Sequence, residues 1–377
     1  MSTRPVAFLD LARQYRSIQA EVDGAVARVL RSGWYVLGAE VAAFERALAA
    51  WCGVGHAVGV NSGTDALTLA LRACGVGPGD GVVTAANTAV PTVCAIVAAG
   101  AVPLLADVDP TTYCLDPDSL RAVLKAGRLG VRVRAVVPVH LYGHTAPMGP
   151  ILEVARAFGL KVVEDAAQAH GTRYDGRHAG TLGDAGCFSC YPTKNLGACG
   201  DAGAVVTDDA ELAGRVRMLR NYGEESKDRN RTRGINSRLD ELQAAILRAK
   251  LPHLDAWVSA RRALARLYDD RLGATGLGLP CESPGTHHSY HLYVVRSRDR
   301  EGLRRALEQR GIGTAVHYPR PIHFQDAYRD LGYGPGDLPG AEQAAREVLS
   351  LPLYPELADD EAHVVASAVR DALASGA

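Results

Sequence analysis

The stretch GDAGCFSCYPTKNLGACGDAGAVVT, residues 183–207, places one polar loop between two apolar runs. Residues 185–191 and 202–207 are small and apolar, which predicts two short buried strands separated by the break at Pro192. Lys194 therefore stands in a loop between buried strands. Burial lowers the pKa of a lysine, and a neutral lysine amine can attack a carbonyl carbon to form a Schiff base. The alternative is a lysine that simply extends to solvent, as most lysines beside a strand end do.

Strands and helices alternate on both sides of that stretch. Alternation predicts an α/β fold with a mostly parallel sheet between two helical layers, which binds ligands where the strands end. We expect strands at 56–60, 82–85, 101–108, 134–139 and 160–164, and helices at 11–31, 65–73, 91–99, 118–125 and 148–158.

Pro252 ends a helix predicted at 239–251, and a long helix predicted at 254–272 follows it. We place a domain boundary there, with a large domain over residues 1–250 and a smaller C-terminal α/β domain over 251–377. The smaller domain is predicted to contain a strand at 290–295 and helices at 302–310 and 361–374. Residues 221–240, which are polar and rich in arginine, are expected to form a loop.

Composition excludes several classes of function. The chain has 41 basic and 42 acidic residues among 377, so no global field attracts nucleic acid or an anionic membrane. Residues 81–106 lack charge, but Pro91 and Pro103 interrupt them, and we expect no transmembrane helix. Eight scattered cysteines are typical of reduced thiols in a cytoplasmic protein. Cys187 and Cys190 form a C-x-x-C pair without a second pair, so we expect buried strand residues and no metal site.

Three further groups of residues fit one cofactor. Ser62, Gly63 and Thr64 precede the helix predicted at 65–73, where free backbone N–H groups and the helix dipole attract a phosphate, although an ordinary helix cap is the alternative. Asp165 and Gln168 follow the strand predicted at 160–164, where an aspartate is either a cap or a ligand contact. Pyridoxal phosphate (PLP) requires a phosphate site, a carboxylate beside its ring nitrogen and a lysine for its aldehyde.

The chain also resembles the DegT/DnrJ family of PLP-dependent nucleotide-sugar aminotransferases over nearly its whole length. The motifs that carry the resemblance are GWYVLGAEVAAFE, NSGTDAL, VHLYGHTAPM, VVEDAAQAHG, CFSCYPTKNLGACGDAGAVV, RNYG, NSRLDELQAAIL, HHSYHLYVV and HYPRPIHFQDAY. The resemblance implies a fold type I transferase, built as a homodimer with active sites at the subunit interface.

The resemblance also implies a role for each candidate residue. Lys194 is similar to the lysine that binds PLP and then carries protons during transfer, and Asp165 to the partner of the ring nitrogen. Gln168 matches the donor near the ring's phenolic oxygen. The phosphate would be held by Ser62, Gly63, Thr64 and Ser189, with Asn236 offered to the phosphate of the other subunit.

The substrate implied by the resemblance is a nucleotide-linked keto sugar, with L-glutamate as the amino donor. NTAVPTV and FSCYPTKNLG look most like enzymes that aminate C3 of dTDP-linked deoxyhexoses, and Ala89 stands where many members carry an aromatic residue. Asn87 and Cys190 depart from the more usual His and Phe. Candidate sugar and diphosphate contacts are Tyr35, Tyr222, His317, Tyr318 and His323, and the two histidines are equally compatible with hydrogen-bonded loop residues.

Alternatives within and outside enzymology remain open at this point. A 4-keto-sugar aminotransferase and a PLP-dependent sugar deaminase or dehydratase use the same groups, although relatives that dehydrate by another route carry histidine at the position of Lys194. A PLP-bearing regulator or binding module is the alternative that is not an enzyme. It is disfavoured because every chemical group needed for catalysis is present.

Overall fold

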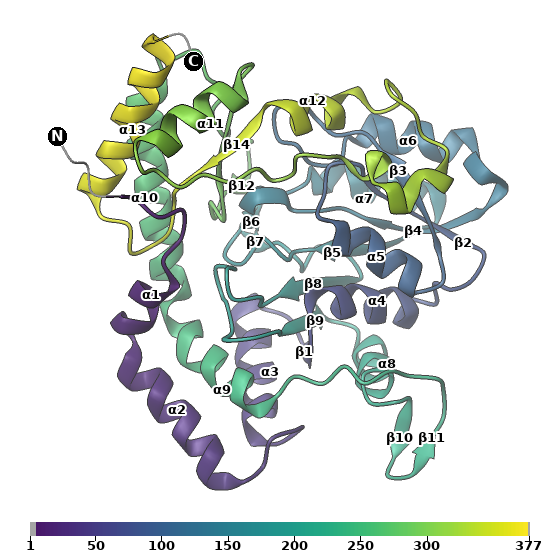
Figure 1. The fold of residues 1–377 in the computed structure, drawn as a ribbon. Coiled ribbons are helices and arrows are strands. Elements are labelled where there is room, and N and C mark those ends of the chain that lie inside the picture. The colour runs from purple at the N-terminus through teal and green to yellow at the C-terminus, as the bar shows by residue number, and fades with distance from the viewer. Residues whose placement is uncertain (1–4, 376–377) are drawn as a thin grey trace.

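A computed structural model describes residues 5–375, and its centre is a seven-stranded sheet (Figure 1). Six strands of the described sheet run in one direction and β9 runs antiparallel to both of its neighbours. In sheet order the strands are β1 (His56–Val60), β9 (Gly203–Thr207), β8 (Ala185–Ser189), β5 (Lys161–Asp165), β4 (Arg132–Val137), β2 (Asp80–Ala85) and β3 (Val102–Ala106). The predicted α/β class with a mostly parallel sheet is confirmed.

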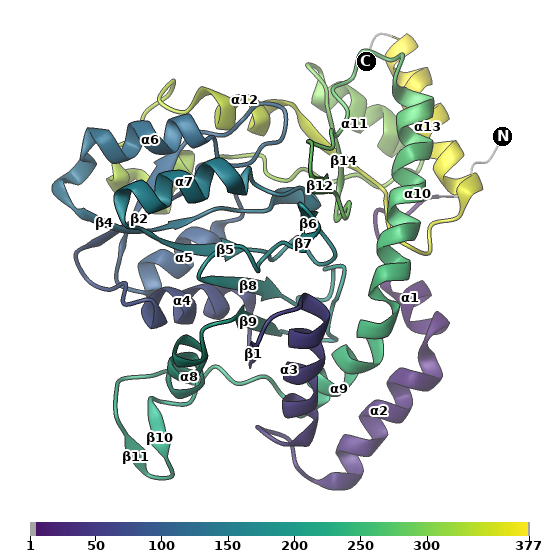
Figure 2. The same ribbon diagram turned by 180° about the vertical axis from the view of Figure 1, so that it is seen from behind.

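The strands are apolar because both faces of the sheet are covered by helices. Along β9, Val205 faces one apolar cluster, whereas Ala204 and Val206 face the cluster on the other side, as the pleat requires. One face carries α4 (Gly63–Ala73), α5 (Val90–Ala98) and α8 (Ala210–Leu219), and the other carries α3 (Ala39–Cys52), α6 (Pro117–Ala126), α7 (Met148–Phe158) and α9 (Glu241–Lys250), as Figures 1 and 2 show.

A second, smaller core lies beside the sheet and is crossed by the long helix α10 (Leu254–Leu272). It contains the antiparallel pair β13 (Tyr293–Arg296) and β14 (Val348–Leu351), with α11 (Arg300–Gln309) and α13 (Asp359–Ala374). Val6 is buried in this core, and its backbone exchanges hydrogen bonds with Gly311 and Gly313.

The two cores also share the C-terminal part of the chain, because residues 322–348 contribute to the core of the large sheet. There α12 (Pro339–Glu347) begins where Asp107 accepts hydrogen bonds from the backbone N–H groups of Gly340 and Ala341. A boundary between residues 250 and 251 stays a prediction.

The remaining α-helices and strands lie outside the two main sheets. They are α1 (Leu11–Ser17), α2 (Gln19–Ser32), the three-stranded sheet of β6 (Arg173–Tyr174), β7 (Arg177–His178) and β12 (Thr286–His287), and the hairpin of β10 (Glu224–Ser226) and β11 (Arg229–Asn230). The hairpin projects from the body of the molecule (Figure 1). No helix within residues 5–375 combines the length and hydropathy that a membrane span needs.

Several predicted elements needed correction. The helix expected at 11–31 is two helices, because Ile18 leaves helical geometry (φ −129°, ψ 22°) and is buried against Ile246 and Trp257. The expected loop at 221–240 contains the hairpin β10–β11, and the strand expected at 290–295 lies at Tyr293–Arg296. Cys187 and Cys190 are buried free thiols, as predicted from their apolar context.

Candidate active site

A cavity of about 480 Å³ opens at the carboxyl ends of the parallel strands, where the fold class predicts a ligand. It brings together eight of the residues expected from the sequence, which come from four separate segments of the chain. They are Ser62, Gly63, Thr64, Asp165, Gln168, Ser189, Lys194 and Tyr318. Thr88, Ala89, Thr92, Tyr191 and Asp201 lie in the same wall.

The loop that carries Lys194 is held tightly at its base. The backbone N–H of Lys194 donates to the carbonyl of Tyr191 at 2.9 Å, which closes a turn around Pro192. A Cβ at Gly197 would lie 2.3 Å from the carbonyl oxygen of Pro192, so only glycine allows the loop to fold back on itself. The Gly197 carbonyl accepts a hydrogen bond of 2.7 Å from Nζ of the buried Lys250. Lys194 is therefore presented to the cavity from a fixed backbone.

The environment of Lys194 favours its neutral amine. Burial lowers the pKa of Lys194 to about 8, and the nearby Asp165 carboxylate partly opposes this shift. Burial also lowers the pKa of His170 to about 3 and of His317 to about 4, with the positive charge of Lys194 adding to both shifts. His291 shifts in the same direction for the same reasons. These histidines are neutral near pH 7. With a pKa of about 8, roughly one tenth of Lys194 is neutral at that pH, against about one part in three thousand for an unshifted lysine, and the neutral amine is the nucleophile.

Asp165 ends β5 and directs its carboxylate into the cavity. Oδ2 accepts a hydrogen bond from the Thr92 hydroxyl at 2.7 Å, and Oδ1 accepts one from the Ala167 N–H at 3.1 Å. Burial raises the pKa of Asp165, whereas these two donors and the nearby Lys194 and His140 lower it. The carboxylate is thus desolvated but supported, which suits it to hold a proton on a neighbouring cationic group.

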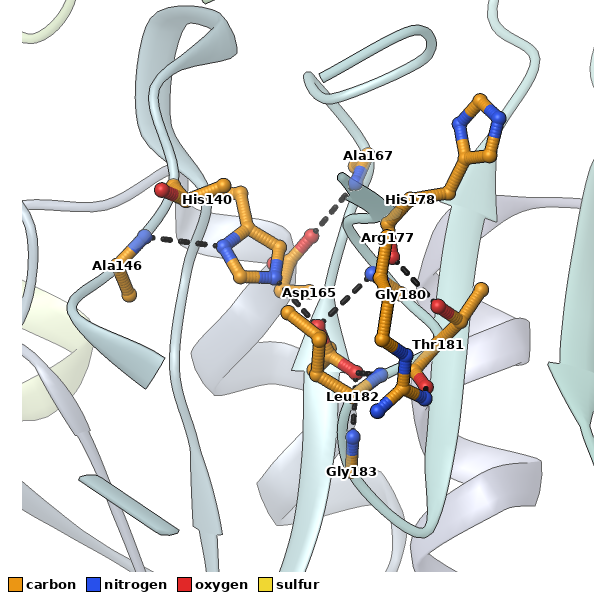
Figure 3. A network of polar contacts seen from close by, with 12 residues as sticks. His140, Ala146, Asp165, Ala167, Arg177, His178, Gly180, Thr181, Leu182 and Gly183 are labelled. Carbon is orange, nitrogen blue, oxygen red and sulfur yellow. Dashed lines mark hydrogen bonds and ion pairs between the residues drawn. The ribbon is translucent and has the colours of Figure 1, made fainter. Parts of the chain in front are cut away.

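The residue before Asp165 is tied into a buried network that Figure 3 shows from close by. Glu164 is fully buried, and its Oε2 accepts from Nε2 of His140 and from the Gly180 N–H, both at 2.8 Å. Its Oε1 accepts from the N–H groups of Leu182 and Gly183, at 2.6 and 2.7 Å.

The tautomer of His140 follows from this network. Nδ1 accepts a hydrogen bond of 3.0 Å from the Ala146 N–H, so the ring proton lies on Nε2 and is donated to Glu164 (Figure 3). The backbone N–H of His140 also donates to the Asp165 carbonyl at 3.0 Å. The network therefore locks the ends of β4 and β5 together directly behind Asp165.

The start of α4 faces the cavity as an anion site. Ser62 caps the helix, with its hydroxyl accepting from the Asp65 N–H at 3.1 Å, and the first residue of the helix is Gly63. A Cβ at Gly63 would lie 2.5 Å from Cβ of Ser189, so glycine is what lets the helix start approach the end of β8. Backbone N–H groups and three hydroxyls, including that of Thr64, are thereby gathered in one concave wall.

Gln168 links two tyrosines at the opposite side of the cavity. Its Oε1 accepts from the Tyr142 N–H at 2.8 Å, and its Nε2 donates to the Tyr318 hydroxyl at 2.9 Å. Burial raises the pKa of Tyr318 to about 12, so its hydroxyl keeps its proton and is a donor at the cavity wall. Gln168 retains one N–H for a ligand.

Comparison with known proteins identifies the family of this chain. The family model described as the DegT/DnrJ/EryC1/StrS aminotransferase family matches residues 16–370. The chain belongs to this family.

The relatives are similar over almost their whole length. A dTDP-3-amino-3,4,6-trideoxy-alpha-D-glucose transaminase of Streptomyces venezuelae is 50% identical over 370 residues, which are 98% of this chain and 96% of the relative. The crystal structure of S. venezuelae DesV in complex with a ketimine intermediate matches with a TM-score of 0.95 and 49% identity, covering 98% of this chain and 99% of that one. NtdA from Bacillus subtilis with bound cofactor PMP matches with a TM-score of 0.90 and 31% identity, covering 99% and 87%. The predictions of the family, the fold class and an enzyme of the aminotransferase class are confirmed.

Five of the residues predicted to contact the substrate or the phosphate do not line the cavity. Tyr35 and Tyr222 are about half exposed, and Asn236 is exposed. His317 and His323 have partners elsewhere, since Nδ1 of His317 bonds the Ser350 hydroxyl at 2.8 Å and Nε2 of His323 lies 3.4 Å from a carboxylate oxygen of Glu342. Their roles as substrate or phosphate contacts stay predictions.

The sequence alone does not single out two parts of the site. The hydroxyls of Thr88 and Thr92 were not singled out, although NTAVPTV follows a parallel strand at the edge where ligands bind. The pairing of His140 with Glu164 was also missed. The signal available for it was a charged residue within an apolar strand, which needs a buried partner.

The donor set fits the cofactor that the sequence predicts. A desolvated lysine, a supported carboxylate and a helix start with hydroxyls correspond to the aldehyde, ring nitrogen and phosphate of PLP. The close approach of Gly63 to Ser189 builds the concave wall that a phosphate requires. Ala89 lines the cavity between Thr88 and Thr92 with a single methyl group.

Proposed function

We propose that this protein is a PLP-dependent transaminase that moves the amino group of L-glutamate to the C3 keto group of a dTDP-linked deoxyhexose. The observation that carries the proposal is Lys194, whose amine has a pKa of about 8 and lies in one cavity with Asp165 and the start of α4. The choice of sugar is supported by the Streptomyces venezuelae relative, whose name is that of a 3-amino-sugar transaminase. We also propose a cytoplasmic location, in keeping with eight unpaired thiols.

PLP, when bound, supplies an electron-withdrawing ring and an aldehyde carbon that accepts the amino group in the first half-reaction and gives it up in the second. Nζ of Lys194 would hold it covalently. Freed by the amino donor, the same Nζ would take the proton from the α-carbon of glutamate and later return one to C3 of the sugar. The Asp165 carboxylate would keep the ring nitrogen protonated, and the start of α4 with Ser62, Thr64 and Ser189 would bind the phosphate.

The homodimer that the sequence predicts would explain the residues outside the cavity. Trp34 is 62% exposed and adjoins the exposed Tyr35 and Val36. Val36 forms a β-bridge with Asp240 and Asn221 forms one with Asn236, so the predicted contacts lie along one connected edge. An exposed aromatic edge of this kind is typical of a subunit interface. We propose that this edge covers the cavity of a second copy and brings Asn236 to its phosphate site.

The experiment that tests the function offers the protein dTDP-3-keto and dTDP-4-keto deoxyhexoses side by side with L-glutamate. The expected products are 2-oxoglutarate and a 3-amino sugar, identified by mass and NMR. Amination at C4 alone would overturn the assignment of the carbon, and no change of cofactor absorption with glutamate would overturn transamination. Lys194→Ala should abolish turnover, whereas Lys161→Ala should not, because Lys161 is half exposed and pairs with Asp184 on the surface.

A further inference from the structure

Asp165 is not held by its own strand alone but by a hydroxyl from a distant helix. Thr92 lies in the first turn of α5, is 1% exposed, and is separated from Asp165 by 73 positions in the sequence. Its hydroxyl lies 2.7 Å from Oδ2 of Asp165. A threonine this close to a helix start usually bonds the backbone of its own helix, so the contact with a buried carboxylate is a separate structural feature.

A second threonine extends the contact toward the cavity. The hydroxyl oxygens of Thr88 and Thr92 are 2.8 Å apart, and both residues line the cavity. An ionised carboxylate only accepts hydrogen bonds, so Thr92 must use its one hydroxyl proton on Asp165. The Thr92 oxygen can then only accept, and Thr88 must donate to it. Hydrogen bonds are therefore donated from Thr88 to Thr92 and from Thr92 to Asp165.

The other groups around Asp165 do not replace the hydrogen bond from Thr92. The Ala167 N–H is bound to the other oxygen, Oδ1. The positive charge of Lys194 acts on the carboxylate from a distance, and no hydrogen bond joins the side chain of Lys194 or of His140 to it among the residues that the structure describes. Cys187 and Tyr318 also lie near, and both keep their protons at neutral pH because burial raises their pKa values. Thr92 is thus the side-chain donor that orients Oδ2.

We propose that Thr92 is a positioning residue that holds Asp165 ionised and aimed at the PLP ring nitrogen, and that Thr88 strengthens this effect by donating to Thr92. The proposal rests on the role of Asp165 in the proposed function. A carboxylate that loses a charge-stabilising donor takes up a proton more readily. Removing the Thr92 hydroxyl therefore shifts the shared proton from the ring nitrogen toward Asp165.

The test measures the ring nitrogen directly, by ¹⁵N NMR of holoenzyme reconstituted with PLP labelled at that atom. Thr92→Val should lower the ratio of protonated to unprotonated ring nitrogen by roughly tenfold or more, the effect of losing one hydrogen bond to a charged group. Thr92→Ser should stay within roughly twofold of the wild type because it keeps the hydroxyl. Thr88→Val should fall between these two variants.

A matched control separates this effect from simple loss of packing. Thr84→Val also replaces a buried threonine, whose hydroxyl donates to the Val137 carbonyl at 2.9 Å, and it should leave the ¹⁵N resonance unchanged. An unchanged resonance in Thr92→Val, or a shift as large in Thr84→Val, would overturn the proposal. If Thr92→Val fails to retain PLP, Thr88→Val decides in its place, and a wild-type ratio there overturns the proposal.

Borohydride reduction and peptide mapping keep this result apart from the proposed function. PLP found on Lys194 in every variant, with no change at the ring nitrogen, contradicts only the role of Thr92. PLP absent from Lys194 in the wild type contradicts the proposed function itself.

Discussion

Glu164→Gln is the substitution whose cost can be worked out most directly from the structure. The carboxylate accepts four hydrogen bonds and is fully buried. A glutamine side chain has one acceptor oxygen and one NH₂ group, so whichever way the amide turns, two donors face the NH₂ group. These are the N–H groups of Leu182 and Gly183, or else His140 and Gly180.

Each buried donor left without an acceptor costs about 1–3 kcal/mol, so we expect Glu164→Gln to lower the free energy of unfolding by about 2–6 kcal/mol. That is a large part of the roughly 5–15 kcal/mol by which proteins are ordinarily stable. The control is Glu211→Gln, because the Glu211 side chain is 90% exposed and pairs with Arg215 at 3.6 Å. Exposed pairs of this kind are worth about 0–1 kcal/mol.

Urea unfolding of both variants, followed by the fluorescence of the three tryptophans at one fixed protein concentration, gives the comparison. Fixed concentration is needed because association of subunits adds to apparent stability. If the free energies of unfolding of Glu164→Gln and Glu211→Gln agree within about 0.5 kcal/mol, the loss of acceptors for two buried donors at Glu164 does not have the expected cost.

Three further predictions follow from the cavity. In the PLP-free protein, the pKa of Lys194 is about 8 in the folded state against an ordinary 10.5 in the unfolded state. The contribution of Lys194 to the free energy of unfolding therefore rises as the pH goes from 8 to 10.5. The difference in urea midpoint between the wild type and Lys194→Met should change over that pH range and not between pH 6 and 7. Gly63→Ala places a methyl group against Ser189 and should weaken PLP binding, as measured by equilibrium dialysis. Gly214→Ala is the control and should leave PLP binding unchanged, because no heavy atom lies within 4 Å of the added carbon. Equal PLP affinities of the two variants would contradict the close approach of Gly63 to Ser189. When inactive Lys194→Ala and Asn236→Ala subunits are mixed and refolded together, half of the dimers formed are hybrids, and each hybrid has one intact active site and one without either residue. The mixture should therefore regain about one quarter of wild-type activity. Hybrids that form but show no activity would contradict shared active sites.

The residues whose place in the cavity could be predicted from the sequence are those whose signals are local. Lys194 stood out because its apolar neighbours and Pro192 define the loop within a few residues. Asp165 stood out because it ends an apolar strand. Their meeting in one cavity followed from the rule that the ends of parallel strands meet at one edge of the sheet.

What could not be predicted depends on contacts between distant parts of the chain. Nothing near Thr92 in the sequence indicates that its hydroxyl bonds a carboxylate 73 positions away, since a threonine near a helix start is common. The break at Ile18 is likewise imposed by packing against Ile246 and Trp257, which overrides a helical pattern that continues across it.

The burial of Val6 beside residues 311–313 sets an order on biosynthesis. A ribosome makes Val6 about three hundred residues before its docking site, so Val6 has no docking site while the residues between them are made. The smaller core is therefore complete only after residues 311–313 have left the ribosome. A protein shortened before residue 311 loses the docking site of Val6, and an affinity tag before Val6 is better attached through a linker that leaves Val6 free to dock.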